Sequence, residues 1–242
     1  MAYQAVFKRY ELKYLLTKEQ KETVINAIEP YMALDAYGRT IIRNLYFDTD
    51  NYRLIRHSIE KPVYKEKLRI RSYRQATSDS PVFVELKKKY HGVVYKRRIS
   101  MPEQNALSWL CNHQPPPVES QISKEIDYFM NYYETLHPVT FLSYEREAYY
   151  SKDGADFRIT FDDHILCRQT DLSLESEIGG TSILDDNLVL MEIKSPGGIP
   201  LWMTRILSAE HIFKTPYSKY GTAYKTIIYP NLKEELTYGN TI

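Results

Sequence analysis

Basic residues stand at alternate positions in one short segment of the chain, and this spacing constrains the fold more than any other feature. They are Lys65, Lys67, Arg69 and Arg71, with Leu68 and Ile70 among the residues between them. A period of two is typical of a β-strand, whose successive side chains point to opposite faces. The strand therefore has one cationic face and one largely apolar face. Rows of like charge repel across a sheet, so a sheet that gathers them needs a polyanion, and phosphate is the first candidate.

The same alternation recurs along the chain. It places further charged residues in phase: Glu85 with Lys87, Lys96 with Arg98, Arg146, Arg158 with Asp162, and Glu192 with Lys194. Edge strands also carry lysine for protection, but two arginines in phase opposite Leu68 and Ile70 favour a ligand-binding face. For Arg146 and Arg158 the alternative is a cross-strand salt bridge, with Glu147 and Asp162 as the respective partners.

Charge is distributed unevenly over the 242 residues, although the net charge is only +1. The segment from Lys61 to Arg98 holds twelve Lys/Arg and three Asp/Glu, whereas Asp171 to Glu192 holds six acidic residues and no Lys or Arg. This pattern predicts a local basic site rather than a uniformly basic surface. Aromatic residues are not interleaved on the basic face, so nucleic acid is not the expected partner.

Two cysteines without metal-ligand spacing indicate a reduced pair. The N-terminus has no apolar signal core, and no run approaches the ~20 apolar residues of a membrane span. We expect a cytoplasmic protein, with attachment to a membrane-protein partner left open and the oligomeric state unknown.

The pattern predicts eight strands in a single domain spanning residues 1–242. They lie near Phe7–Leu15, Thr40–Phe47, Val63–Tyr73, Val82–Lys88, Val93–Ser100, Val139–Tyr149, Asp156–His164 and Leu188–Lys194. Thr17 is the expected N-cap of a helix that ends near Pro30, and a short helix follows near Asp50–Ile59. A helical insertion occupies about 101–136, a polar acidic surface loop Asp171–Asn187, and C-terminal helices about 200–228.

Eight strands with few crossover helices imply an α+β fold with an antiparallel sheet closed into a barrel. The polar face would line the lumen, and helices would cover the apolar outside. Burying so many ionic groups in a dry core would cost several kcal/mol each, whereas a wet lumen holding an anionic ligand avoids that cost.

The chemistry open to this chain is narrowed by what the sequence lacks. The histidines are scattered, and no HExxH motif, nucleophile elbow or Walker A loop is present. Phosphoryl transfer still fits, because it needs mainly positioning and charge neutralisation. Glu192 would either balance charge or bind Mg²⁺ or Mn²⁺ that bridges phosphate oxygens.

Taken in order, several motifs resemble the VTC domain, the polyphosphate-polymerising domain of the vacuolar transporter chaperone family, in its bacterial form. That family belongs to the CYTH / triphosphate tunnel metalloenzyme superfamily. The resemblance rests on residues 10–14 (YELKY), 44–48 (NLYFD), 68–71 (LRIR), 84–87 (VELK), 144–146 (YER), 158–162 (RITFD), 191–194 (MEIK) and 217–220 (YSKY). No single piece is specific, but their order and spacing are.

The resemblance implies an eight-stranded tunnel that binds ATP and inorganic polyphosphate. The expected catalytic residues are Lys13, Arg69, Arg71, Lys87, Arg146 and Lys219. The expected phosphate-binding residues are Lys96, Arg98, Arg158, Lys194 and Ser218. Tyr144 would flank the nucleobase, and Glu192 would bind Mn²⁺ or Mg²⁺.

One departure from the pattern bears on the reaction. Hydrolytic relatives carry Glu-x-Glu-x-Lys in the first strand, whereas this chain has Arg9 in place of the first Glu. A metal-binding carboxylate is lost and a cation gained, which favours a polyphosphate polymerase using the γ-phosphoryl of ATP. A metal-dependent tripolyphosphate or polyphosphate hydrolase and a non-catalytic polyphosphate-binding module remain the alternatives.

Overall fold

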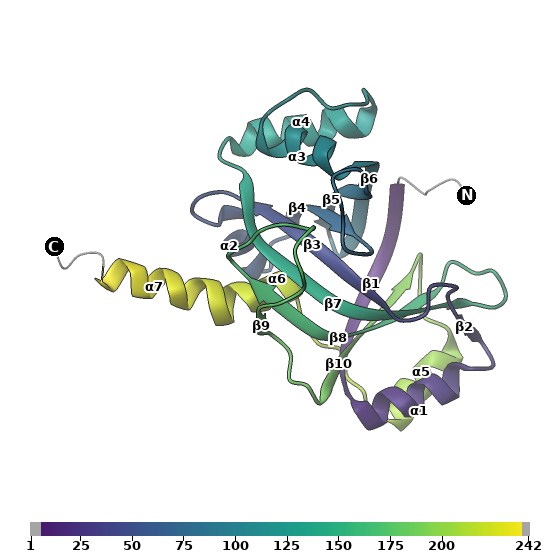
Figure 1. Ribbon diagram of the computed structural model, residues 1–242. Helices are drawn as coiled ribbons and strands as arrows, with labels where there is room; N and C mark the ends of the chain where they lie inside the picture. The colour runs from purple at the N-terminus through teal and green to yellow at the C-terminus, as the bar shows by residue number, and fades with distance from the viewer. Residues whose placement is uncertain (1–5, 239–242) are drawn as a thin grey trace.

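A large antiparallel sheet forms the centre of the molecule. The computed structural model describes residues 6–238 (Figure 1). Within them the strands are β1 (Val6–Thr17), β2 (Met32–Leu34), β3 (Thr40–Asp48), β4 (Tyr64–Ser72), β5 (Pro81–Tyr90), β6 (Val93–Pro102), β7 (His137–Ser151), β8 (Arg158–Arg168), β9 (Thr181–Ser182) and β10 (Leu188–Ser195). The helices are α1 (Lys18–Ile28), α2 (Arg53–Ile59), α3 (Glu103–Cys111), α4 (Gln121–Tyr133), α5 (Leu201–Ala209), α6 (Lys219–Ala223) and α7 (Tyr229–Tyr238), with a π-helical turn at Tyr224–Ile228.

The sheet rings round on itself. Its strand order is β2-β7-β3-β4-β5-β6-β1-β10-β8-β9, and an additional pairing joins β7 to β8. The long strands therefore return to their starting point, with β2 and β9 appended outside the ring. The sequence predicted eight strands, and this number was too low for the described residues. The two extra strands have three and two residues, which is too short to show a period of two.

Local signals fix the ends of several elements. Thr17 ends β1 and caps α1, and its hydroxyl and the Gln20 side chain form a reciprocal capping box. His91 and Gly92 join β5 to β6 with φ of +45° and +84°, the left-handed pair that a two-residue hairpin turn requires. The cap at Thr17 agrees with the sequence prediction.

Helices cover the outer, apolar face of the ring. The inserted helices α3 and α4 bring Trp109, Ile126 and Phe129 onto Leu68 and other apolar residues of β3, β4 and β5. Helices α1 and α5 lie on the opposite side of the molecule (Figure 1), over the apolar face shared by β1, β8 and β10. Each large side chain buried in this way contributes about 1.5–3 kcal/mol. The core therefore lies between the ring and the helices.

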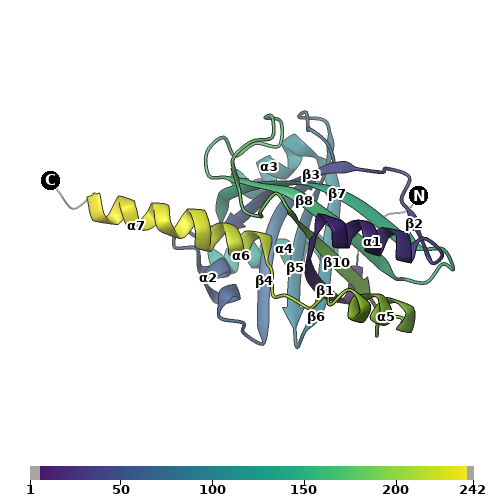
Figure 2. The same ribbon diagram turned by 90° about the horizontal axis from the view of Figure 1, so that it is seen from below.

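The C-terminal helical segment is longer than the sequence predicted. The expected helix ended at Ile228, but the chain passes through the π-helical turn into α7, which projects from the body (Figures 1 and 2). Pro230 lies just beyond the predicted end, and proline usually ends a helix. Here α6, the π-helical turn and α7 follow one another without a break, and Pro230 lies within this continuous helical segment, directly after the π-helical turn.

The acidic segment Asp171–Asn187 is only partly a surface loop. Leu174 within it is fully buried against the core, and Arg43 donates hydrogen bonds to the carbonyl oxygens of Leu174 and Ser176. Cys111 and Cys167 are free thiols, as predicted. Among residues 6–238, no helix combines the length and apolar character needed to cross a membrane.

Candidate functional site

Charged side chains gather on the inner face of the ring. The cations are Lys13, Lys67, Arg69, Arg71, Lys87, Lys96, Arg98, Arg146, Lys194 and Lys219, and the carboxylates among them are Glu11, Glu85, Asp162 and Glu192. They face one another across the ring, since Lys67 of β4 is electrostatically coupled to Lys13 of β1, and these strands do not pair. Positive charge therefore exceeds negative charge on this face.

Glu85 of β5 is the centre of one cluster. Its side chain is fully buried, and its two oxygens accept hydrogen bonds from Arg69 of β4 and Arg98 of β6. Lys96 lies 3.3 Å and Arg71 3.8 Å from the same carboxylate. Burial opposes ionisation of Glu85, but these four cations outweigh it and hold its pKa well below the usual range.

Asp162 of β8 and Glu192 of β10 form a second cluster. Arg146 of β7 donates two hydrogen bonds to Asp162, of 2.5 and 2.6 Å, and Lys219 of α6 contacts both carboxylates. Glu192 also lies 3.1 Å from Lys13 and 2.9 Å from Lys194. Lys13, Lys219, Lys194 and Arg146 hold the pKa of Glu192 well below its usual range, despite burial.

Helix α6 contributes to the inner face through its first residues. Ser218 caps the helix, and its hydroxyl accepts a hydrogen bond of 3.2 Å from Lys67. Tyr220 donates to Asp48, whose carboxylate also accepts from the backbone amides at the start of α2. This network fixes α6 against β3, so Lys219 reaches the second cluster.

Lys67 differs from the other cations of the inner face. Among the described residues no carboxylate pairs with it, and its electrostatic neighbours Lys13, Lys87, Lys65 and Arg69 are all cationic. Burial and these charges lower the pKa of Lys67 to about 7. Burial also lowers the pKa of Lys96 to about 7 and that of Lys194 to about 8, despite the nearby Glu85 and Glu192.

Most of the residues predicted from the sequence are brought together here. From strands come Lys13, Arg69, Arg71, Lys87, Lys96, Arg98, Tyr144, Arg146, Glu192 and Lys194, and from α6 and its cap come Lys219 and Ser218. Tyr144 is buried, accepts a hydrogen bond from Arg71 and lies against Arg146 and Lys219. Arg158, by contrast, is exposed at the beginning of β8. The sequence alternative of a cross-strand ion pair holds for Arg146, but its partner is Asp162 rather than Glu147.

Sequence reasoning gave no role to several residues that organise the site. Glu11 pairs with Lys87 at 2.5 Å, and Glu85 and Asp162 anchor the two clusters. Glu11 alternates with Lys13 and Glu85 with Lys87, which was a usable signal, because this spacing places each carboxylate on the same face as its lysine. Asn44 and Tyr46, which bind Arg71 and Arg69, gave no such signal.

The inner carboxylates have the chemistry that a hard divalent cation requires. Lys219 contacts both Glu192 and Asp162, and the charges of Glu192 and Glu11 repel each other. Mg²⁺ and Mn²⁺ take carboxylate and phosphate oxygens together. The Glu192 oxygens now accept from lysine and arginine, so an ion would enter with phosphates that draw those cations away. A separate group, Glu145, Asp163 and His164, is close enough to share an ion, but Arg39 already binds its two carboxylates.

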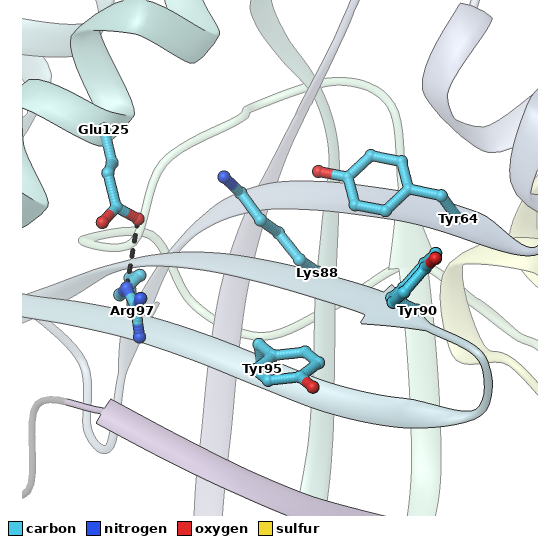
Figure 3. A pocket seen from close by; sticks show the side chains of 6 residues that line it. All are labelled: Tyr64, Lys88, Tyr90, Tyr95, Arg97 and Glu125. Atoms are coloured by element: carbon cyan, nitrogen blue, oxygen red, sulfur yellow. Dashed lines mark hydrogen bonds and ion pairs between the residues drawn. The ribbon is translucent and has the colours of Figure 1, made fainter.

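A surface pocket of about 400 Å³ lies on the outer side of the β5–β6 hairpin (Figure 3). It is lined by Tyr64, Lys88, Tyr90, Tyr95, Arg97 and Glu125. Arg97 is paired with Glu125 across it. The pocket is separate from the inner cluster, because Lys88 and Arg97 alternate with Lys87, Lys96 and Arg98 along their strands.

Fold and site together define an α+β protein whose antiparallel sheet rings round a cation-rich face. A family model, that of the VTC domain, matches residues 8–228. The chain therefore belongs to the VTC domain family. No curated protein matches its sequence.

Solved structures with a similar fold include two proteins described as candidate cyclases. A candidate adenylate cyclase from Bacillus halodurans has a TM-score of 0.56 and 17% identity, covering 89% of this chain and 96% of that one. A candidate adenylyl cyclase from Hippeastrum, described as having a dominant triphosphatase activity, has a TM-score of 0.54 and 15% identity, with 90% and 95% covered. At these identities the likeness concerns the fold.

Proposed function

We propose that this protein is a polyphosphate polymerase, a phosphotransferase that moves the γ-phosphoryl group of ATP to a growing inorganic polyphosphate chain. In this proposal the ring is an eight-stranded triphosphate tunnel with a polar, basic lumen. The observation that carries it is the excess of cations, most of them half-buried, over carboxylates on one inner face, in a chain of the VTC domain family. Such an excess is stable when a condensed phosphate fills the space between the cations.

The reaction requires little from the protein beyond charge and position. The bond between the γ-phosphorus and its bridging oxygen breaks, and a bond to a terminal oxygen of the polyphosphate chain forms. That oxygen is already anionic, so no strong base is needed. Arginine is suited to forked contacts with phosphoryl oxygens, and we assign this role to Arg69, Arg98 and Arg146, with lysines offsetting charge on the flanking phosphates.

Glu192, with Glu11 and Asp162 nearby, would hold Mn²⁺ or Mg²⁺. The ion would supply further neutralisation of phosphate oxygens. Lys219 and Lys13, which contact Glu192, would then turn to the substrate. The nucleobase contact of Tyr144, the cytoplasmic location and the membrane-protein partner stay predictions of the sequence.

The test is to incubate the purified protein with ATP and Mn²⁺ and to resolve the products. ADP together with long-chain polyphosphate on a gel supports the proposal. An Arg69→Ala variant should lose product formation, whereas Lys88→Ala, on the outer face, should retain it. Omission of the metal should abolish the reaction in the wild type and in Lys88→Ala.

A hydrolase of tripolyphosphate or polyphosphate is the second candidate. The triphosphatase activity described for the similarly folded Hippeastrum protein favours it. Only the acceptor differs, because water would replace the terminal phosphate oxygen. ADP with orthophosphate and no polymer would decide for the hydrolase, while tight tripolyphosphate binding without turnover would decide for a binding module.

A further inference from the structure

Glu85 occupies an unexpected place for a carboxylate in an anion-binding site. It lies in register with Arg69 on β4 and with Arg98 on β6, so its neighbour on each side is an arginine. Arg69 donates from Nε and Nη2 to Oε2 at 2.9 and 2.7 Å, and Arg98 donates from Nε and Nη2 to Oε1 at 2.8 and 2.6 Å. The Glu85 carboxylate thus binds the Nε–Nη2 edge of each of the two guanidinium groups, with one oxygen for each arginine.

Other contacts complete the orientation of these arginines. Nη1 of Arg69 donates to the Tyr46 hydroxyl at 2.8 Å, and Nη2 of Arg98 donates to the Tyr73 hydroxyl at 2.8 Å. The Arg98 guanidinium also lies 4.1 Å from the centre of the Phe83 ring. Both side chains are therefore fixed on more than one side before any ligand arrives.

Affinity alone does not explain a carboxylate at this point. A negative charge beside Arg69 and Arg98 weakens the attraction of the site for phosphate, and the effect is strong because the group is fully buried. A glutamine would fill the same volume and leave the site more positive. What the carboxylate supplies, and an amide cannot, is an acceptor pair that fixes two guanidinium groups at once.

We propose that Glu85 is a positioning residue, which lowers phosphate affinity but aims Arg69 and Arg98 at the phosphoryl group in transfer. The inference rests on the proposed function. A phosphoryl group passes through a transition state whose charge is spread over three oxygens, and fixed donors stabilise it better than mobile ones. Loss of the Glu85 charge should therefore lower turnover without lowering the affinity for phosphate.

The first experiment compares Glu85→Gln with the wild type and with Glu125→Gln. Glu125 also pairs with an arginine, Arg97, but on the outer face, so it is the matched control. We expect Glu85→Gln to bind tripolyphosphate as tightly as the wild type or up to tenfold more tightly, by calorimetry. We expect its kcat with ATP and Mn²⁺ to fall at least tenfold without a rise in KM. Glu125→Gln should match the wild type in both.

A parallel loss of affinity and kcat in Glu85→Gln would overturn the inference, as would a kcat within twofold of the wild type. If Glu85→Gln fails to fold without ligand, tripolyphosphate should restore its folding, because the ligand supplies the missing negative charge. Failure to refold in the presence of tripolyphosphate would show a purely structural role.

A second readout is independent of turnover. The Nε–H signals of Arg69 and Arg98, assigned by Arg→Lys substitution, should be ordered in NMR relaxation of the wild type and mobile in Glu85→Gln. Equal order in both proteins would overturn the inference. If the wild type binds tripolyphosphate but makes no polymer, the polymerase proposal fails, while these signals still decide the role of Glu85.

Discussion

Among the described residues, every cation of the inner face except Lys67 pairs with a carboxylate. This difference predicts how single substitutions behave. Arg69 and Arg98 share Glu85, and Arg146 and Lys219 share Asp162. Lys67 has a hydroxyl, Ser218, as its neighbour instead. The tied residues keep their orientation without ligand, whereas the charge of Lys67 depends on whether a phosphate is present.

Replacing Arg69 by alanine should weaken tripolyphosphate binding. A hydrogen bond to a charged group contributes about 1.5–3 kcal/mol, so affinity should fall about ten- to a hundredfold. Calorimetric titration measures this, with Lys88→Ala as the control because Lys88 lies on the outer side of β5. Unchanged affinity in Arg69→Ala would place the phosphates elsewhere.

Binding of tripolyphosphate should weaken as the pH rises through 7. The pKa of Lys67 in the free protein is lowered to about 7, so this side chain is largely neutral at pH 8. Phosphate favours the ammonium form and raises that pKa, so binding takes up a proton. The contribution of Lys67 to affinity is then greatest below pH 7 and falls by up to tenfold per pH unit above it.

A Lys67→Met variant separates this effect from titration of the ligand, which is common to both proteins. The variant should show a shallower pH dependence between 7 and 9, and less proton uptake in calorimetry across buffers of different ionisation enthalpy. The same lowered pKa means that the unfolded chain binds more protons above pH 7. The contribution of Lys67 to folding stability therefore rises with pH in this window. Identical pH profiles in the two proteins would refute the assignment.

At the scale of elements, periodicity predicted the strands well and missed what is too short or too irregular to have a period. The row from Lys65 to Arg71 became β4, with Leu68 and Ile70 fully buried on its other face. The sequence analysis missed β2 and β9, because strands of three and two residues are too short to show an alternation of apolar and polar side chains. Arg158 shares the phase of Asp162 but lies at the start of its strand, where the side chain reaches solvent. The alternation of side chains predicts which face of the sheet a residue lies on, but not how close it lies to the end of its strand.

The loop before β9 depends on one glycine. Gly180 has φ of +126°, and a Cβ there would lie 2.3 Å from the carbonyl oxygen of Cys167 in β8. Gly180→Ala should therefore displace the loop and destabilise the protein by about 1–3 kcal/mol. A shift in Tm of about 2–4 °C per kcal/mol is expected for a chain of this size. Gly179→Ala is the control, because its Cβ would meet nothing within 4 Å, and equal Tm values for the two variants would contradict the prediction.

For the whole molecule, the sequence indicated the ring and its basic face but not which charges meet. Glu85 contacts Arg98 within the β5–β6 hairpin, whose pairing follows from the turn at His91 and Gly92, and contacts Arg69 on the other neighbouring strand, β4. Arg146, Asp162, Glu192 and Lys219 come from four elements spread over residues 137–223. Their contact depends on the β7–β8 and β8–β10 pairings and on the position of α6. Long-range register of this kind has no local signal.

Enclosure of the cations by the ring leads to a prediction about which polyanions bind. In the proposed function tripolyphosphate reaches the cations of the inner face, whereas rigid duplex DNA cannot bring its phosphates to a face that the ring surrounds. A ligand that binds only the folded protein raises its stability by RT ln(1 + [L]/Kd), about 2.7 kcal/mol at a hundredfold excess over Kd. Tripolyphosphate should therefore raise Tm by several degrees, and duplex DNA at equal phosphate concentration should not. The stabilisation by tripolyphosphate should shrink in Arg146→Gln and persist in Lys88→Ala. If DNA stabilises the protein equally and Lys88→Ala abolishes the effect, the basic residues of the outer surface, and not the inner clusters, bind the anion.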